Sequence, residues 1–148
     1  MTTFIEIEPD VFVAPQLVET DFAELAKLGF VSVVNNRPDG EAADQLPSDR
    51  AAAVAERHGL NYRYLPVMNM NVIDDDVVEA QARVMERLEG RTLFYCRSGN
   101  RCTILWAQTA VARLGVDETI ARASRAGFDI EGFREHLEEL ADRMAEAA

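Results

Sequence analysis

The sequence predicts an α/β fold with a largely parallel central sheet, and three observations support that prediction. Short apolar runs rich in β-branched residues alternate along the chain with segments of helical periodicity. The length of 148 residues suits one domain with a sizeable core. Hydrophobic residues make up 48% and charged residues 28% of the sequence, as in folded globular proteins. We therefore expect residues 1–148 to form a single domain, with the helices of residues 118–148 packing on it.

Strands, helices and one long loop alternate before residue 68. Pro9–Asp10 separates the first two apolar runs, and Gly29 ends the first helical segment. The run at 30–34 is apolar and β-branched, as in a strand buried on both faces. Pro38–Gly40 has the composition of a turn. The expected elements are strands at Phe4–Ile7 and Val11–Val13, a helix from a Thr20 cap to Leu28, a strand at Phe30–Val34, a loop at 35–47, a helix from Ser48 to about His58 and a strand at Asn61–Val67.

The second part of the chain continues the alternation. Asp74 is the expected cap of a helix with apolar residues at helical spacing, which Gly90 ends. Gly115 ends a later, strongly apolar helix. The expected elements are a loop at 68–71, a helix from Asp74 to Leu88, a strand at Thr92–Tyr95, a loop at Cys96–Cys102, a helix at Ile104–Leu114 and two acidic helices at about 117–126 and 130–145.

Three loops are expected to meet at one edge of this sheet. Right-handed crossovers between parallel strands place the loops that follow the strands along the same edge. Ligands of such sheets bind outside the carboxyl ends of the strands. The loops at 35–41, 68–71 and 96–101 therefore mark the expected site.

Composition excludes several classes of function. The 26 acidic and 15 basic residues give a net charge of −11, which disfavours binding to nucleic-acid backbones and to anionic membranes. The two cysteines and two histidines lack the spacing of a metal site, so we expect neither a metal nor another cofactor. The N-terminus carries Glu6 and Glu8 and does not resemble a signal peptide, and no apolar stretch approaches the roughly 18 residues of a membrane span. The expected location is the cytoplasm.

Cys96 lies where a buried strand passes into a glycine-containing loop that opens a helix. Backbone N–H groups in such a loop, together with the helix N-terminus, bind anions and stabilise a thiolate. Arg97 and Arg101 bring two guanidinium groups close to the sulfur in sequence. These features indicate a nucleophilic cysteine beside an anion pocket, with a phosphoryl group as its target and Arg101 holding the phosphate oxygens.

The segment Tyr95–Thr103 resembles the phosphate-binding loop of cysteine-dependent protein phosphatases. In that loop a glycine stands at the third position after the cysteine, an arginine at the sixth and a serine or threonine at the seventh. Gly99 and Thr103 match, whereas Arg101 is one position early and Cys102 occupies the arginine position. Tyr95 stands where those enzymes usually have a histidine.

A second motif narrows the resemblance. Together with Asn35–Glu41 and Leu105–Ala107, the cysteine loop is similar to the phosphatase-like domain of bacterial beta-lactamase hydrolase-like proteins, over about Val11–Ala126. That resemblance implies a three-layer phosphatase-like fold, a phosphocysteine intermediate on Cys96, and an anionic small molecule or phosphorylated compound as substrate. The sequence does not indicate an oligomeric state.

The residues assigned to the site form three groups. Cys96 is the expected nucleophile, Arg101 the phosphate-binding residue and Asp39 the candidate general acid. The loop residues expected to bind the anion are Arg97, Ser98, Gly99, Asn100, Cys102 and Thr103. The residues expected at the rim of the pocket are Arg37, Met68 and Asn69.

Three functions remain open on the sequence alone. The first is a cysteine-dependent phosphatase. The second is a sulfurtransferase carrying a persulfide on Cys96, because the short spacing to Arg101 also resembles the active loop of rhodanese-type enzymes. The third is a non-catalytic anion-binding module, since the loop at 68–71 contains no carboxylate where dual-specificity phosphatases place their acid.

Three residues also have alternative roles. Asp39 is either an acid or a turn residue. Arg37 either binds substrate or pairs with Glu41. Cys102 either packs in its helix or forms a disulfide with Cys96 under oxidation.

Overall fold

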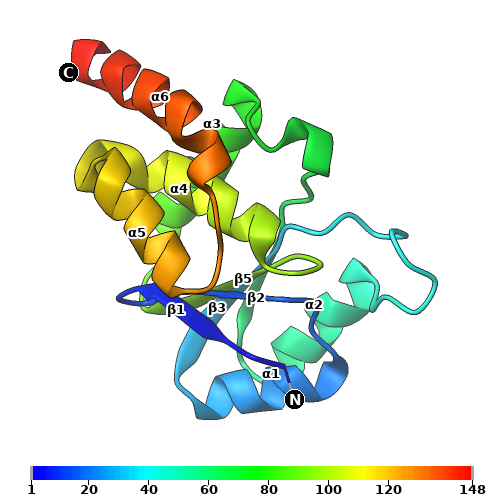
Figure 1. Ribbon diagram of the computed structural model, residues 1–148. Helices are drawn as coiled ribbons and strands as arrows, with labels where there is room; N and C mark the ends of the chain where they lie inside the picture. The colour runs from blue at the N-terminus through cyan, green and yellow to red at the C-terminus, as the bar shows by residue number, and fades with distance from the viewer. Residues whose placement is uncertain (1, 148) are drawn as a thin grey trace.

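The computed structural model describes residues 2–147. In it, a five-stranded sheet lies between two layers of helices (Figure 1). The strand order is β1-β2-β5-β3-β4, and only the β1–β2 pair is antiparallel. The expected α/β fold with a mostly parallel central sheet is therefore confirmed. The strands are β1 (Ile5–Glu8), β2 (Val11–Ala14), β3 (Phe30–Asn35), β4 (Asn61–Tyr64) and β5 (Arg91–Tyr95).

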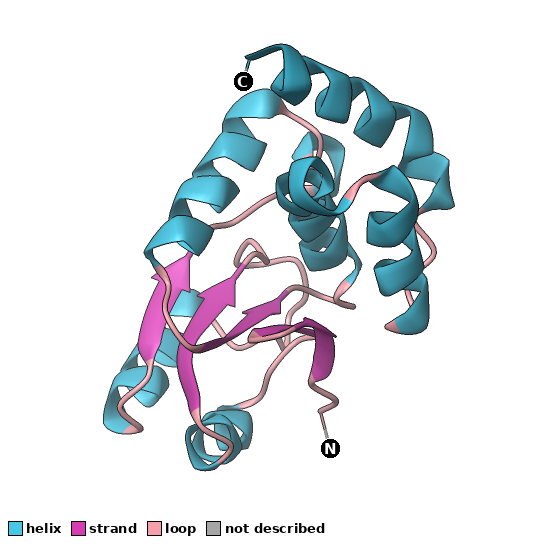
Figure 2. Cartoon of the chain, turned by 90° about the vertical axis from the view of Figure 1, so that its left-hand side faces the viewer, coloured by secondary structure: helices cyan, strands magenta, loops and turns pink. Residues whose placement is uncertain are grey.

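Helices cover both faces of the sheet, as Figures 1 and 2 show. Helices α1 and α2 lie on one face, and the remaining four lie on the other. This arrangement is the expected three-layer architecture. The helices are α1 (Glu19–Lys27), α2 (Ser48–Arg57), α3 (Asp75–Arg87), α4 (Asn100–Leu114), α5 (Val116–Arg125) and α6 (Arg134–Ala147), with short 3-10 turns η1 (Asn69–Asn71) and η2 (Glu131–Phe133). Across residues 2–147, no helix combines the length and the apolar composition needed to cross a bilayer.

Strand β5 lies at the centre of the sheet, between β2 and β3. Tyr95, the last residue of β5, is in register with Ala14 of β2 and with Asn35 of β3. The three strands therefore end at the same level, and the residues that follow them leave the sheet side by side. Asn36 N–H donates to the Tyr95 carbonyl at 2.8 Å, and Cys96 N–H donates to the Ala14 carbonyl at 3.3 Å.

Helix α4 is the central helix of its layer. It packs against α3, α5 and α6, and its residues 101–108 are all buried. A helix surrounded in this way holds its first turn rigidly against the end of β5, because close-packed side chains leave little room for movement. Helices α5 and α6 pack on α4 and on each other; the assignment of residues 1–148 to a single domain stays a prediction.

Several expected boundaries are wrong. Helix α4 begins at Asn100 and not at Ile104. Thr20 is not the cap of α1: Val18 is the N-cap, and its N–H donates to the Asp21 carboxylate at 2.7 Å. An acidic side chain at the third helical position thus accepts the hydrogen bond of the N-cap N–H, which has no partner inside the helix. The strand expected to reach Val67 ends at Tyr64, although Leu65 N–H and Val67 N–H still donate to the Asn35 and Asn36 carbonyls at 2.9 Å each.

Candidate functional site

The segment Cys96–Gly99 joins β5 to α4 at the carboxyl edge of the sheet. Gly99 is the N-cap of α4 and has φ +92°, a conformation that other residues adopt only with strain. A Cβ atom at this position would also lie 2.9 Å from Phe128 Cζ. Glycine is therefore required here by both the backbone and the packing. The Gly99 N–H donates to Cys96 Sγ at 3.1 Å.

The pKa of Cys96 is lowered to about 6. A hydrogen bond from the Cys102 thiol makes the largest contribution, and backbone N–H groups of Cys102, Ser98 and Gly99 add to it against the opposing effect of burial. Donors aimed at a sulfur stabilise its ionised form. The donors around Cys96 Sγ are therefore the physical reason to expect a thiolate in this loop.

Cys102 is the neutral partner of this pair. Burial raises its pKa well above the ordinary value, so it keeps its proton while Cys96 loses one. Its Sγ also lies 3.3 Å from Asn36 Oδ1, an alternative acceptor for the same S–H. The Asn36 amide is held in place because its Nδ2 donates to the Leu65 carbonyl and to Gln81 Oε1.

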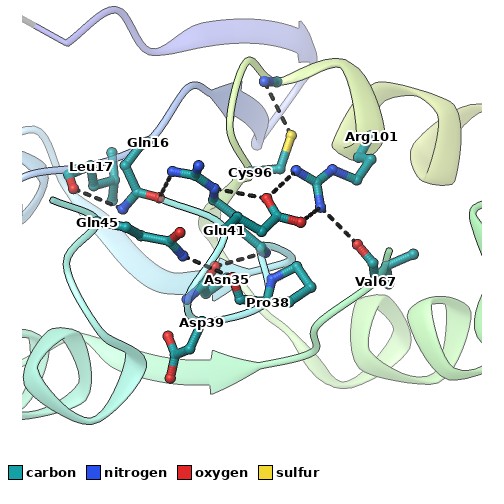
Figure 3. Close-up of polar contacts among 12 residues, drawn as sticks. Gln16, Leu17, Asn35, Pro38, Asp39, Glu41, Gln45, Val67, Cys96 and Arg101 are labelled. Atoms are coloured by element: carbon teal, nitrogen blue, oxygen red, sulfur yellow. Dashed lines mark hydrogen bonds and ion pairs between the residues drawn. The ribbon is translucent and has the colours of Figure 1, made fainter. Parts of the chain in front are cut away.

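Arg101 lies in the first turn of α4 and is 4% exposed. Its Nη1 donates to Glu41 Oε2 at 2.8 Å and to the Val67 carbonyl at 2.9 Å, and its Nη2 donates to Glu41 Oε1 at 2.8 Å (Figure 3). Of the five N–H donors of a guanidinium group, these bonds leave Nε–H and one Nη2–H, which point from the same edge. That edge is a fork suited to two oxygens of an anion.

Glu41 joins two arginines with one carboxylate. Its Oε1 accepts a hydrogen bond from Arg37 Nε at 2.9 Å as well as the one from Arg101. The hydrogen bonds from Arg101, opposed by burial and assisted by Arg37, lower the pKa of Glu41 to about 2. Arg37 Nη1 in turn donates to Gln16 Oε1 at 3.0 Å, so the chain of contacts reaches the loop after β2.

The structure brings Arg37 together with Arg101 and the cysteine loop, but it does not bring Asp39 there. Asp39 Oδ1 accepts the N–H of Ser48, the first residue of α2, at 2.8 Å. Figure 3 shows the Asp39 carboxylate directed away from Cys96. In this conformation the Asp39 carboxylate accepts a backbone N–H at the start of α2.

The other expected residues have distinct surroundings. Ser98 Oγ accepts the Asn100 N–H at 3.3 Å, and Thr103 Oγ1 donates to the Gly99 carbonyl at 2.9 Å. Within residues 2–147, no hydrogen bond or ion pair involves the exposed side chain of Arg97. Met68 and Asn69 are exposed and directly follow Val67, the residue whose carbonyl contacts Arg101.

Tyr95, which stands in the usual histidine position, points away from the thiolate. Its ring belongs to the core cluster on the α1–α2 side of the sheet, whereas Cys96 belongs to a separate cluster. Alternation along a strand places neighbours on opposite faces. The Tyr95 hydroxyl is buried and has no hydrogen-bond partner among the described residues, and burial raises its pKa.

Glu41, Asn36 and Gln16 are site residues for which the sequence predicts no individual binding or catalytic role. The first two lie in the loop at 35–41, one of the three loops expected at the site. A carboxylate four positions after Arg37 is a recognisable ion-pair spacing, but nothing in the sequence connects it to Arg101. No local pattern marks Gln16, because its role depends on the pairing of β2 with β5.

The thiol is almost enclosed in this conformation. Cys96 is 1% exposed. Beside the cysteine loop lies a hollow of about 880 Å³, which extends from the start of α1 to the loop before α2 and reaches both Arg37 and Arg97. Within residues 2–147, no group of three or more His, Cys, Asp or Glu side chains could hold a metal ion.

The fold, a mostly parallel sheet between helical layers with a cysteine loop at the end of its central strand, is the fold of several phosphatase structures. The structure matches that of kinase-associated phosphatase with its catalytic-site cysteine substituted by serine, with a TM-score of 0.76 at 12% identity over 98% of this chain and 96% of that chain. It also matches a candidate phosphatase from Shewanella putrefaciens CN-32, with a TM-score of 0.74 at 18% identity over 95% and 91% of the two chains.

The chain belongs to the phosphatase-like domain family of beta-lactamase hydrolase-like proteins, whose family model matches residues 3–113. The crystal structure of a candidate phosphatase from Neisseria meningitidis Z2491 is 32% identical, with a TM-score of 0.82 over 92% of this chain and 96% of that chain. A beta-lactamase hydrolase-like protein of Xylella fastidiosa (strain Temecula1 / ATCC 700964) is 33% identical over 128 residues, which are 85% of this chain. The match spans 30% of that longer relative.

Proposed function

We propose that the protein is a cysteine-dependent phosphatase-like hydrolase in which Cys96 is the nucleophile. The observation that carries this proposal is the pairing of a stabilised thiolate with an arginine whose remaining donors form one open fork. A thiolate beside a preformed anion site suits attack on the phosphorus of a phosphate ester.

The reaction has two steps. The Cys96 thiolate attacks phosphorus, an S–P bond forms, and the P–O bond to the leaving group breaks with its electron pair on oxygen. Water then attacks phosphorus, the S–P bond breaks, and inorganic phosphate leaves while the thiolate is restored. Arg101 and the loop N–H groups stabilise the charge on the phosphoryl oxygens in both steps.

Leaving-group protonation limits the substrates of this site. Glu41 has a pKa of about 2 and is ionised at neutral pH, so it cannot donate a proton there. Asp39 is directed toward α2 in this conformation. General acid catalysis contributes roughly 10²–10⁴-fold to such reactions. We therefore expect rapid turnover only for esters with good leaving groups, such as aryl phosphates.

Mass spectrometry of the intact protein tests the proposal. Rapid quenching with 4-nitrophenyl phosphate is expected to add one phosphoryl group to Cys96, and Cys96→Ser is expected to abolish both adduct and turnover. Cys102→Ser is the matched control, because it changes the neighbouring thiol and leaves the nucleophile. A persulfide on Cys96 after treatment with a sulfane-sulfur donor, without any phosphoryl adduct, would instead identify a sulfurtransferase. Phosphate binding without either adduct would identify a binding module.

A further inference from the structure

The hollow beside the cysteine loop contains polar groups with unused hydrogen-bonding capacity. Its lining includes Arg37 and Gln45, from the loop between β3 and α2, and Arg97, from the cysteine loop. Arg37 is 3% exposed and Gln45 is 9% exposed, so both are held within the structure and are not mobile surface groups.

The guanidinium group of Arg37 has N–H donors that are not used in hydrogen bonds. Its Nε–H bonds to Glu41 and one Nη1–H bonds to Gln16, while its Nη2 has no hydrogen bond within residues 2–147. The unpartnered, fully buried side-chain N and O atoms in this part of the chain are Gln45 Oε1 and the Tyr95 hydroxyl. Nη2 is not among them, and Arg37 lines the hollow. A guanidinium that is held by two neighbours and keeps unused N–H donors is preorganised to bind an anion.

Gln45 also lines the hollow, and its amide oxygen is fully buried beneath that surface. Its Nε2 donates to the Pro38 carbonyl at 2.9 Å, which fixes the orientation of the amide and leaves Oε1 without a partner. Figure 3 shows this amide beside Gln16 and Glu41. A buried acceptor without a donor is costly unless a ligand or water satisfies it.

The two positive groups lie close together. Arg37 Nε and Arg101 Nη2 lie 2.9 Å and 2.8 Å from the same oxygen, Glu41 Oε1. An anion on Arg37 would therefore sit a short distance from an anion on the open edge of Arg101. Arg97 adds a guanidinium to the lining that is unpaired within residues 2–147, while the lining carboxylate of Glu19 is already paired with Arg50. Asp44 is the remaining acidic residue of the lining.

We propose that this hollow is a second anion subsite, and that the substrates are phosphate esters with a good leaving group that also carry a second anionic group, a carboxylate or a further phosphate, a few bonds from the first. The inference rests on the proposed function for the role of Arg101. The phosphoryl group binds the open edge of Arg101 and the loop, and the second anion binds Arg37 and Arg97.

Calorimetric titration of the Cys96→Ser protein tests this subsite without any need for turnover. The probes are ethyl phosphate, which has one anionic group, and phosphoglycolate, which adds a carboxylate. We expect phosphoglycolate to bind about tenfold more tightly, the factor typical of one added charge-assisted contact. Arg37→Gln in the same background is expected to bring the ratio of the two affinities close to one. Arg97→Gln is a second variant that is expected to lower the same ratio.

The control is Arg87→Gln, which removes the same charge at the C-terminal end of α3. This residue precedes the start of β5, whereas the cysteine loop follows its end, so the ratio of the two affinities is expected to stay unchanged. Equal affinities for the two probes in the Cys96→Ser protein, or a preference that survives in both Arg37→Gln and Arg97→Gln, would overturn the subsite and leave the proposed function standing. If neither probe binds, both proposals fail. If both bind but the wild type does not hydrolyse 4-nitrophenyl phosphate, the hydrolase proposal fails while the ratio still decides the subsite.

Discussion

Glu41 and Arg101 are 60 positions apart in the chain and form a bidentate ion pair, with both carboxylate oxygens 2.8 Å from guanidinium nitrogens. The pair selects which edge of the arginine stays open toward the cysteine loop. Glu41 is thus a positioning residue, whereas Cys96 and Arg101 are the groups proposed to touch the substrate.

Replacing Glu41 with glutamine is expected to lower the free energy of unfolding by about 1–3 kcal/mol, because the buried Arg101 loses its charged partner. Urea denaturation measures this change. Glu118→Gln is the control, since its pair with Arg122 lies at an exposed surface where ion pairs contribute little. An unchanged denaturation midpoint in Glu41→Gln would show that the pair does not stabilise the fold.

The same pair predicts an acid dependence of stability. The pKa of Glu41 falls from 4.5, its ordinary value, to about 2 in the folded protein. Its stabilising contribution is therefore complete above about pH 4.5 and is lost as the pH falls toward 2. We expect the difference in melting temperature between wild type and Glu41→Gln to shrink over this interval. A difference that stays constant from neutral pH to pH 3 would contradict the assignment.

The cysteine pair predicts different titration of two neighbouring thiols. Cys96, with a pKa of about 6, is expected to be mostly ionised at neutral pH, while Cys102 stays protonated. The ultraviolet absorbance of thiolate measures ionisation without requiring access to the buried sulfur. Cys102→Ala removes the S–H donor and is expected to raise the midpoint of Cys96 by about one unit, the equivalent of one hydrogen bond to a charged group. Cys96→Ser should remove the transition, and its persistence in that variant would assign it elsewhere.

Gly99→Ala is expected to destabilise the protein more than Gly127→Ala does. Both glycines have positive φ, +92° and +96°, but only a Cβ at position 99 meets another atom, 2.9 Å away on Phe128. Backbone strain is expected to cost about 1–2 kcal/mol in both variants, and displacement of the Phe128 ring at least about 1 kcal/mol more in Gly99→Ala. Thermal unfolding of the two variants checks this difference, and equal losses would mean that the ring moves freely.

Much of the fold follows from local patterns. The β-branched run ending at Val34 and the run Thr92–Tyr95 are both predicted as buried strands. Both lie in the interior of the sheet, where they pair with each other. The glycine loop after Tyr95 is predicted at the carboxyl edge, where it is found. The errors lie at the ends of elements, as at Val18, where the Asp21 side chain caps the helix, and after Tyr64.

The identity of the candidate nucleophile and its loop was available from residues 95–103, because a strand end, a glycine and a helix start are local features. What surrounds that sulfur was not. The bond of Cys102 to Asn36, the pairing of Arg101 with Glu41 and the contact of Arg37 with Gln16 all join loops that are distant in the chain. These loops become neighbours only because β5 pairs with both β2 and β3, in a register that ends all three strands together. Periodicity encodes which face of an element is buried, but pairing and register decide which polar groups meet.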